Sequence, residues 1–184
     1  MAAAVLAENL SLSINGKDIL RQITLSVEPG ETLVLMGKNG SGKTMLLKTL
    51  VGLFTPQQGK ALILGQDVHR LAHGDLDALR RKIGYVFQKS GLFDSLHVWE
   101  NVVFALRRFS DLNEHELRAK ATDCLNRSGL KDVEDKYPSE LSGGMQKRAG
   151  IARAIAMDPG ILLFDDPTAG LDPVLTDAIA ELIE

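Results

Sequence analysis

One octapeptide restricts the possible folds of this 184-residue chain more than any other stretch. Residues 37–44 read Gly-Lys-Asn-Gly-Ser-Gly-Lys-Thr and fit the phosphate-binding pattern Gly-x-x-x-x-Gly-Lys-Ser/Thr at every fixed position. The apolar run 32–36 before it predicts a buried parallel strand, and the apolar face of residues 46–51 after it predicts a helix. This order favours a nucleoside-triphosphate site over an ordinary glycine-rich turn.

The residue types of this loop suit a triphosphate. Its glycines allow the backbone to aim successive N–H groups into one concavity, which the positive end of the following helix also faces. Lys43 adds a charge for the β- and γ-phosphates, and Thr44 offers a hydroxyl to Mg²⁺. The predicted nucleotide-binding residues here are Gly37, Lys38, Asn39, Gly40, Ser41, Gly42, Lys43 and Thr44.

Composition and charge narrow the class of protein. The length fits one domain or slightly more, and 45 % hydrophobic residues are enough for a packed core. The net charge of −3 argues against a nucleic-acid partner. A single cysteine, Cys124, excludes an internal disulfide and fits a reducing cytosol. The N-terminus lacks the basic start of a signal peptide, and no run reaches the roughly 18 apolar residues of a membrane span.

An antiparallel element is predicted ahead of the phosphate loop. Alternating apolar and polar residues predict strands over residues 4–13 and 18–27, and the pair Asn15-Gly16 between them is a hairpin signal. Pro29-Gly30 is predicted to turn the chain into the next strand. Small GTPases and nucleotide kinases usually place the loop after the first strand, so this order differs from theirs.

A short helix and two more strands are predicted after the loop. Residues 60–64 read as a strand, and Asp75 is a candidate cap for a helix through Arg81. Residues 83–87 read as a strand that ends at Gln88. A glutamine there can reach Mg²⁺ or a water, although an ordinary exposed glutamine fits the pattern equally well.

Residues 89–157 are predicted to be mostly helical and to form an inserted helical subdomain. Within them, Asn113 is a suitable N-cap and Gly129 a suitable end for one helix. The buried stripe of that helix includes Cys124, which is therefore most simply a core residue.

A second anion-binding helix terminus is predicted where residues 141–146 read Leu-Ser-Gly-Gly-Met-Gln. Ser142 can cap the helix, and Gly143 and Gly144 leave N–H groups accessible at its start. Glycine is a poor helix former, which favours a closely approaching ligand over an ordinary capped helix.

Two carboxylates follow the apolar run 161–164, which predicts a second buried strand. In a protein with a phosphate loop, a carboxylate at the end of such a strand is the expected second anchor for Mg²⁺, and the candidates are Asp165 and Asp166. Asp172-Pro173 predicts the cap and first turn of a final helix over residues 173–184.

The order of these segments resembles the nucleotide-binding subunit of ABC transporters. In that family's terms they are the Walker A loop, the Q-loop, the signature, Walker B and the D-loop. The Walker A loop is residues 37–44, the Q-loop residue is Gln88 and the signature is residues 141–145. Walker B is residues 161–166 and the D-loop is residues 169–172. The signature separates this family from other P-loop classes, and the resemblance covers essentially the whole chain.

The resemblance implies an α/β fold, that of a P-loop NTPase. A RecA-like core would carry an antiparallel β-subdomain and a helical subdomain at about 89–157. Residues 1–184 would then be one ABC-type nucleotide-binding domain, incomplete at its C-terminus. Family members continue to a histidine that contacts the γ-phosphate, and no histidine follows the signature here, so we expect a truncated chain.

A head-to-tail dimer is the assembly that the resemblance implies. Each ATP would lie between the Walker A loop of one protomer and the signature of the other. Ser142, Gly143 and Gly144 would then bind the nucleotide held by the partner, and Asp172 would contact the partner across the dimer.

The same resemblance implies an ATPase with ATP and Mg²⁺ as its ligands. Thr44, Gln88 and Asp165 would hold the metal, and Asp166, Gln88 and Lys43 would be the catalytic residues. The family usually has glutamate at the position of Asp166, and the shorter side chain predicts slow hydrolysis because a base must reach its water. Ile14 stands near the place of the family's adenine-stacking aromatic, which predicts a weaker base preference.

Residues 87–102, together with the signature Leu-Ser-Gly-Gly-Met at 141–145, are similar to ATPases of lipid-transporting Mla/Mce-type systems. This implies a peripheral subunit on the cytoplasmic face of the inner membrane that drives phospholipid or hydrophobic-solute transport. Its partners would be transmembrane permease subunits and a lipid-binding substrate protein. The alternatives are the ATPase of an amino-acid-type small-solute importer, or a non-transport ABC ATPase. Residues 89–101 could also simply pack the helical subdomain.

Overall fold

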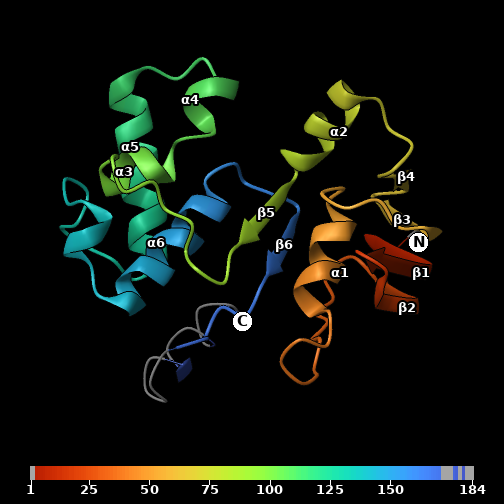
Figure 1. Cartoon of the computed structure of the whole chain (residues 1–184). Helices are drawn as coiled ribbons and strands as arrows, with labels where there is room; N and C mark the ends of the chain where they lie inside the picture. Colours follow the sequence, from red (N-terminus) through yellow and green to blue (C-terminus); the bar gives the residue numbers. More distant parts are fainter. Residues whose placement is uncertain (1–2, 171–175, 178–179, 181–184) are drawn as a thin grey trace. The chain divides into compact units, whose positions relative to one another are not determined.

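The computed structural model describes residues 3–170, 176–177 and 180. The chain divides into two compact units, Met1–Arg80 and Arg81–Glu184, and Figure 1 shows the elements of each. The predicted partner contact at Asp172 and most of the predicted helix 173–184 lie outside the described residues.

A four-stranded antiparallel sheet forms the base of the first unit, in the order β2-β1-β3-β4. Its strands are β1 (Val5–Ile14), β2 (Lys17–Val27), β3 (Gln58–Ile63) and β4 (Gln66–Asp67). Asn15 and Gly16 have positive φ values of 50° and 77° and connect paired residues of β1 and β2. Both residue types tolerate this conformation, so the predicted hairpin is confirmed.

Two helices accompany this sheet, α1 (Lys43–Leu50) and α2 (His73–Arg80). The face of α1 predicted to be apolar is buried, and α1 contacts β2 and β3. The expectation that Asp75 caps α2 is wrong, because Asp75 lies in its first turn. The N–H of Leu76 already bonds the main-chain oxygen of Ala72 at 2.9 Å, so the helix starts earlier without that cap.

The predicted buried strand over residues 32–36 is wrong in this structure. No strand is assigned to this segment, and Val34 and Met36 are 73 % and 90 % exposed. A strand forms only where a neighbouring main chain completes its ladder of hydrogen bonds. The four strands of the sheet in this unit pair with one another and not with this segment.

The second unit contains two short parallel strands with helices between them in the chain, as Figure 1 shows. The strands are β5 (Ile83–Val86) and β6 (Ile161–Phe164). Between them lie α3 (Val98–Val102), α4 (Leu106–Phe109), α5 (Glu114–Arg127), the 3₁₀ helix η1 (Pro138–Glu140) and α6 (Gly143–Ile155). The expected helical character of residues 89–157 is thus confirmed.

An apolar core joins α3, α4, α5 and α6. The helix α5 has the predicted cap, since the Asn113 side chain accepts from the N–H of Glu116 at 3.0 Å. In return, the Glu116 carboxylate accepts from the N–H of Asn113 at 2.8 Å. Cys124 is fully buried in this core, as expected.

A second face of α6 packs against β5, with Val86, Ile151 and Ala154 buried together. Successive strand residues point to opposite faces, and α6 covers one of them. This explains why Leu162 in β6 is exposed, contrary to the prediction of a fully buried strand. The strand β5 also ends one residue earlier than predicted, at Val86, and Phe87 is exposed.

Candidate functional site

The phosphate loop of the first unit folds around its own lysine. The Lys43 Nζ donates to the main-chain oxygens of Gly37 at 2.7 Å and Lys38 at 3.3 Å. Gly42 has φ +101°, and a β-carbon there would come within 3.0 Å of the Ile19 oxygen. Only glycine fits this backbone comfortably, so the pattern residue at position 42 has a local structural reason.

The N-terminus of α1 is open to an anion. Gly42 provides no side-chain cap, and the first turn of α1 contains no acidic residue. The N–H groups of that turn and the positive end of the helix are the features that bind anions at helix starts, and they lie beside the charge of Lys43. Asn39, Gly40 and Ser41 complete the loop that leads into this turn.

The other predicted polar residues meet at the ends of β5 and β6. The Asp165 N–H donates to the Val86 oxygen at 2.9 Å, which continues the parallel pairing by one step. The Gln88 Nε2 donates to the Asp166 Oδ2 at 3.2 Å. The structure therefore brings Gln88 and Asp166 into direct contact, although they are 78 residues apart in the sequence.

Asp165 and Asp166 occupy different environments although they are neighbours. Asp165 is only 5 % exposed, and the Tyr85 hydroxyl donates to its Oδ2 at 3.3 Å. Burial is the main cause that raises the pKa of Tyr85, and the negative charge of Asp165 adds to it. The hydroxyl therefore remains a donor at neutral pH. The sequence analysis missed Tyr85, because nothing in the run 83–87 indicates which residue its hydroxyl will face.

Asp166 is exposed and has φ +49°. This left-handed conformation is uncommon outside glycine, and aspartate and asparagine tolerate it better than most residues. Backbone of this kind costs free energy and concentrates at functional sites. The turn is held by the Ala169 N–H, which donates to the Asp166 oxygen at 3.2 Å.

The start of α6 has the predicted cap. The Ser142 Oγ accepts from the Met145 N–H at 3.3 Å, and Ser142 and Gly143 are exposed while Gly144 is buried. A cavity of about 350 Å³ lies beside this helix start. Its lining residues are Gln88, Lys89, Ser90, Gly143, Gln146, Lys147, Ala169 and Gly170. The structure thus places Gln88 and Gly143 at one cavity.

Two basic residues of α6 contact the chain after β5, and the sequence analysis missed both. Lys147 is 7 % exposed, and its Nζ donates to the Gln88 main-chain oxygen. Burial lowers the pKa of Lys147, and the charges of Asp166 and Asp165 oppose that shift. Burial also lowers the pKa of Arg153, which donates to the oxygens of Gly91 and Ser90.

The predicted Mg²⁺ ligands have the right chemistry for that ion. Thr44, Gln88 and Asp165 offer a hydroxyl, an amide and a carboxylate oxygen, and hard cations prefer oxygen ligands. Because the Gln88 amide nitrogen faces Asp166, its amide oxygen is the atom left for a cation. In the described part of the chain, no cluster of three or more His, Cys, Asp or Glu offers a site built from protein ligands alone. This fits Mg²⁺, which is commonly bound by one or two protein groups together with phosphates.

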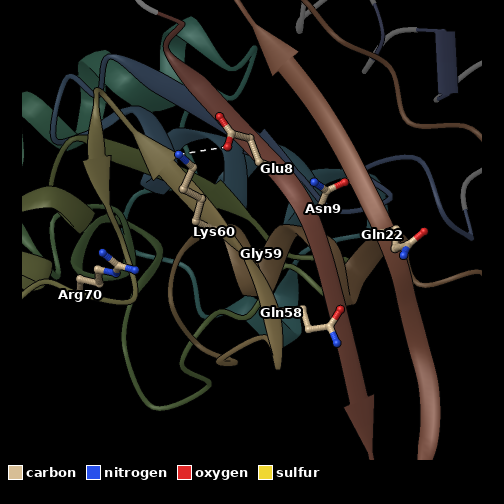
Figure 2. A pocket seen from close by; sticks show the side chains of 7 residues that line it. All are labelled: Glu8, Asn9, Gln22, Gln58, Gly59, Lys60 and Arg70. Atoms are coloured by element: carbon tan, nitrogen blue, oxygen red, sulfur yellow. Dashed lines mark ion pairs between the residues drawn. The ribbon is translucent and has the colours of Figure 1, made fainter.

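A hollow lined mostly by residues of the antiparallel sheet is separate from the phosphate loop (Figure 2). Its volume is about 570 Å³, and none of the predicted site residues lines it. Lys60 pairs with Glu8 at 3.0 Å, and Arg70 pairs with Asp67 at 3.3 Å. With both cations already paired, this hollow offers little to a nucleotide phosphate.

A phosphate-binding loop that opens a helix, in a mixed α/β chain with an antiparallel sheet and helices, defines a P-loop NTPase. The family model described as "ABC transporter" matches residues 20–169, and the chain belongs to that family. Among the described residues, no helix is both long and apolar enough to cross a membrane.

Curated relatives carry different transport names. A "probable ribonucleotide transport ATP-binding protein" of Mycobacterium leprae is 40 % identical over the whole chain, which covers 53 % of that relative. An "intermembrane phospholipid transport system ATP-binding protein" of Haemophilus influenzae is 38 % identical, over 96 % of this chain and 67 % of the relative. An "L-cystine import ATP-binding protein" of Bacillus subtilis is also 38 % identical, over 96 % of this chain and 73 % of the relative. The chain spans about half the length of the mycobacterial relatives.

Solved structures agree with the family assignment. A dimeric ATP-binding cassette in a post-hydrolysis state, bound to ADP and Pi, superposes with a TM-score of 0.88 at 33 % identity. The match covers 97 % of this chain and 81 % of that cassette. A dimeric bacterial ABC transporter cassette gives a TM-score of 0.89 at 32 % identity over the same shares.

Proposed function

We propose that this chain is the ATP-binding and ATP-hydrolysing part of an ABC transporter, and that residues 1–184 form its nucleotide-binding domain with a helical subdomain at about 89–157. The observation that carries the proposal is the phosphate loop around Lys43 at the uncapped start of α1. The contact between Gln88 and Asp166 supports hydrolysis in addition to binding, because a carboxylate there can accept a proton from an attacking water.

The residues divide into three roles in this proposal. Residues 37–44 bind the phosphates, and Lys43 also stabilises the charge that develops on the γ-phosphate. Thr44, Gln88 and Asp165 hold Mg²⁺, which neutralises phosphate charge when bound. Asp166 is the general base, oriented by the Gln88 amide at 3.2 Å. Ser142, Gly143 and Gly144 bind the ATP of a second protomer in a head-to-tail dimer.

The transported substrate that we propose is a phospholipid or another hydrophobic solute. The likeness to the Haemophilus phospholipid-transport protein supports it. We propose accordingly that the chain is a peripheral subunit on the cytoplasmic face of the inner membrane, with permease subunits and a lipid-binding substrate protein as partners and no nucleic acid. The comparably similar cystine-import relative supports the second candidate, an amino-acid importer. The two candidates are distinguished by measuring ATP turnover with the reconstituted permease. Stimulation by phospholipid supports the first candidate, and stimulation by L-cystine supports the second.

Nucleotide binding tests the proposal directly. Lys43→Ala removes a charged contact to the phosphates and is expected to raise the Kd for Mg-ATP about tenfold or more. Isothermal titration of the wild-type and variant proteins measures the change. Lys48→Ala, in the last turn of the same helix, is the matched control and should leave the Kd unchanged. Equal affinities for the wild-type and Lys43→Ala proteins would remove the loop from the site.

A further inference from the structure

Three residues on one face of α6 contact the chain segment that carries Gln88. Lys147, Gly150 and Arg153 are spaced three apart, so they follow one another along the same side of the helix. The segment is residues 88–91, named here the Gln88 loop. All of these residues belong to the second unit.

The side chains of Lys147 and Arg153 donate hydrogen bonds to main-chain oxygens of the loop and not to its side chains. Lys147 donates to the Gln88 oxygen through its Nζ. Arg153 donates through Nη1 to the Gly91 oxygen at 2.6 Å and through Nη2 to the Ser90 oxygen at 2.7 Å. Hydrogen bonds from a charged donor are about twice as strong as neutral ones. Three of the four carbonyls of the Gln88 loop therefore bind cations of a single helix.

Gly150 lets the loop lie close to the helix between the two cations. A β-carbon at this position would meet the Ser90 oxygen at 3.3 Å and the Ser90 Cα at 3.5 Å. The loop would have to shift by a few tenths of an ångström to admit even a methyl group. The glycine thus sets the depth of the loop, and the two cations fix its ends.

We propose that Lys147, Gly150 and Arg153 form a carbonyl clamp that positions Gln88 for the reaction. The inference rests on the proposed ATPase function. The clamp holds the backbone of Gln88 while the side chain of the same residue contacts Asp166 at 3.2 Å. Lys147 and Arg153 are positioning residues, because they act on the reacting groups only through Gln88.

The clamp also connects two parts of the proposed site. The helix that carries it begins at the Ser142 cap, where the phosphate of a second nucleotide is proposed to bind. A movement of this helix start would carry Lys147, Gly150 and Arg153 with it, because all three belong to the same helix. Occupation of the signature end can therefore change the alignment of Gln88 and Asp166 at the other nucleotide.

Limited proteolysis tests the clamp without any need for turnover. Trypsin can cut after Lys89 in the exposed part of the loop and after the exposed Lys131 outside it. Lys147→Met removes the donor and is expected to raise the rate of cutting after Lys89 about tenfold relative to Lys131. Arg153→Gln should act in the same direction, and Lys147→Arg should restore the wild-type ratio. Arg127→Gln, on the exposed end of α5, is the matched control.

Kinetics test the positioning role. Lys147→Met is expected to lower kcat about tenfold to a hundredfold, as a displaced reacting group does, and to leave the KM for ATP within about twofold. A lysine with a purely structural role would lower thermal stability without this split between kcat and KM.

The two assays separate the clamp from the function on which it rests. An unchanged Lys89 to Lys131 cutting ratio in both variants overturns the clamp. A raised ratio with unchanged kcat overturns its effect on Gln88. If the wild-type protein binds no ATP and shows no turnover, the proposed function fails, and the cutting ratio alone decides whether the clamp exists.

Discussion

Asp166 shows how one residue combines a conformational requirement with a chemical one. Its φ of +49° follows the end of β6, and its carboxylate receives the Gln88 amide. Aspartate and asparagine are among the side chains that best tolerate this backbone, and glutamate tolerates it less well. The shorter carboxylate at this position therefore has a local structural advantage, whatever it costs in reach toward the water.

Asp166→Asn should abolish ATP turnover and spare ATP binding. Asparagine keeps the backbone preference and loses the proposed general base, and general-base catalysis typically contributes about 10²–10⁴-fold. Phosphate release at saturating ATP, with binding measured in parallel, gives both quantities.

Asp166→Glu provides the matched comparison. It retains a carboxylate and should retain turnover, with some loss of thermal stability from the less favourable backbone. Turnover by Asp166→Asn equal to that of the wild-type protein would remove Asp166 from the mechanism.

At the scale of elements, Asn101 on α3 organises the loop before its own helix. Its Oδ1 accepts from the Phe93 N–H at 2.7 Å. Its Nδ2 donates to the oxygens of Phe93, Leu96 and His97, each at 3.1 Å. Asn101 is fully buried, and all its hydrogen bonds go to main-chain groups of this loop. The loop is therefore held in one shape with its apolar side chains placed by the backbone.

That shape leaves Phe93 on the surface. Phe93 is 46 % exposed and its ring lies 4.6 Å from that of Phe104, which is 51 % exposed. Trp99 instead packs against the core of the helices. An exposed aromatic pair commonly marks a protein interface, so we expect the permease to dock here.

Phe93→Ser should prevent co-purification with the permease subunits and leave the ATPase activity of the isolated protein intact. The reason is that the substitution removes apolar contact area without touching a nucleotide ligand. Leu53→Ser, at an exposed apolar position of the first unit, is the control. Intact co-purification of the Phe93→Ser protein would assign Phe93 a merely structural role.

Short sequence patterns predicted the hairpin and the helix caps correctly. They did not predict contacts between segments that are distant in the sequence. The hairpin at Asn15-Gly16, the Asn113 cap and the Ser142 cap each depend on a few neighbouring residues, and all three are confirmed. The run 32–36 is apolar enough for a strand, but its sequence cannot tell which main chain will pair with it. For the same reason the sequence around Lys147 and Arg153 does not indicate that these side chains bind main-chain oxygens of a loop about 60 residues earlier.

At the scale of the whole molecule, two helix starts among the described residues are candidates for binding phosphate, at α1 and at α6. In the proposed dimer, one nucleotide lies between the α1 terminus of one protomer and the α6 terminus of the other. Turnover per protomer should then rise with protein concentration, whereas a site complete within one protomer would give a constant value. Phosphate release over a range of protein concentrations distinguishes these cases.

Substitutions at Ser142 separate its role as a helix cap from its role toward the partner's nucleotide. Asp and Asn cap helices about as well as Ser, so Ser142→Asp and Ser142→Asn should both keep the thermal stability within about 1 kcal/mol. Only Ser142→Asp places a negative charge where the γ-phosphate of the partner is proposed to lie, and like charges at close range repel. Ser142→Asp should therefore lose the concentration-dependent turnover while Ser142→Asn retains most of it, and both should bind ATP normally at low protein concentration. Phosphate release, thermal unfolding and ATP titration measure these three properties, and equal turnover by the two variants would place Ser142 away from any phosphate.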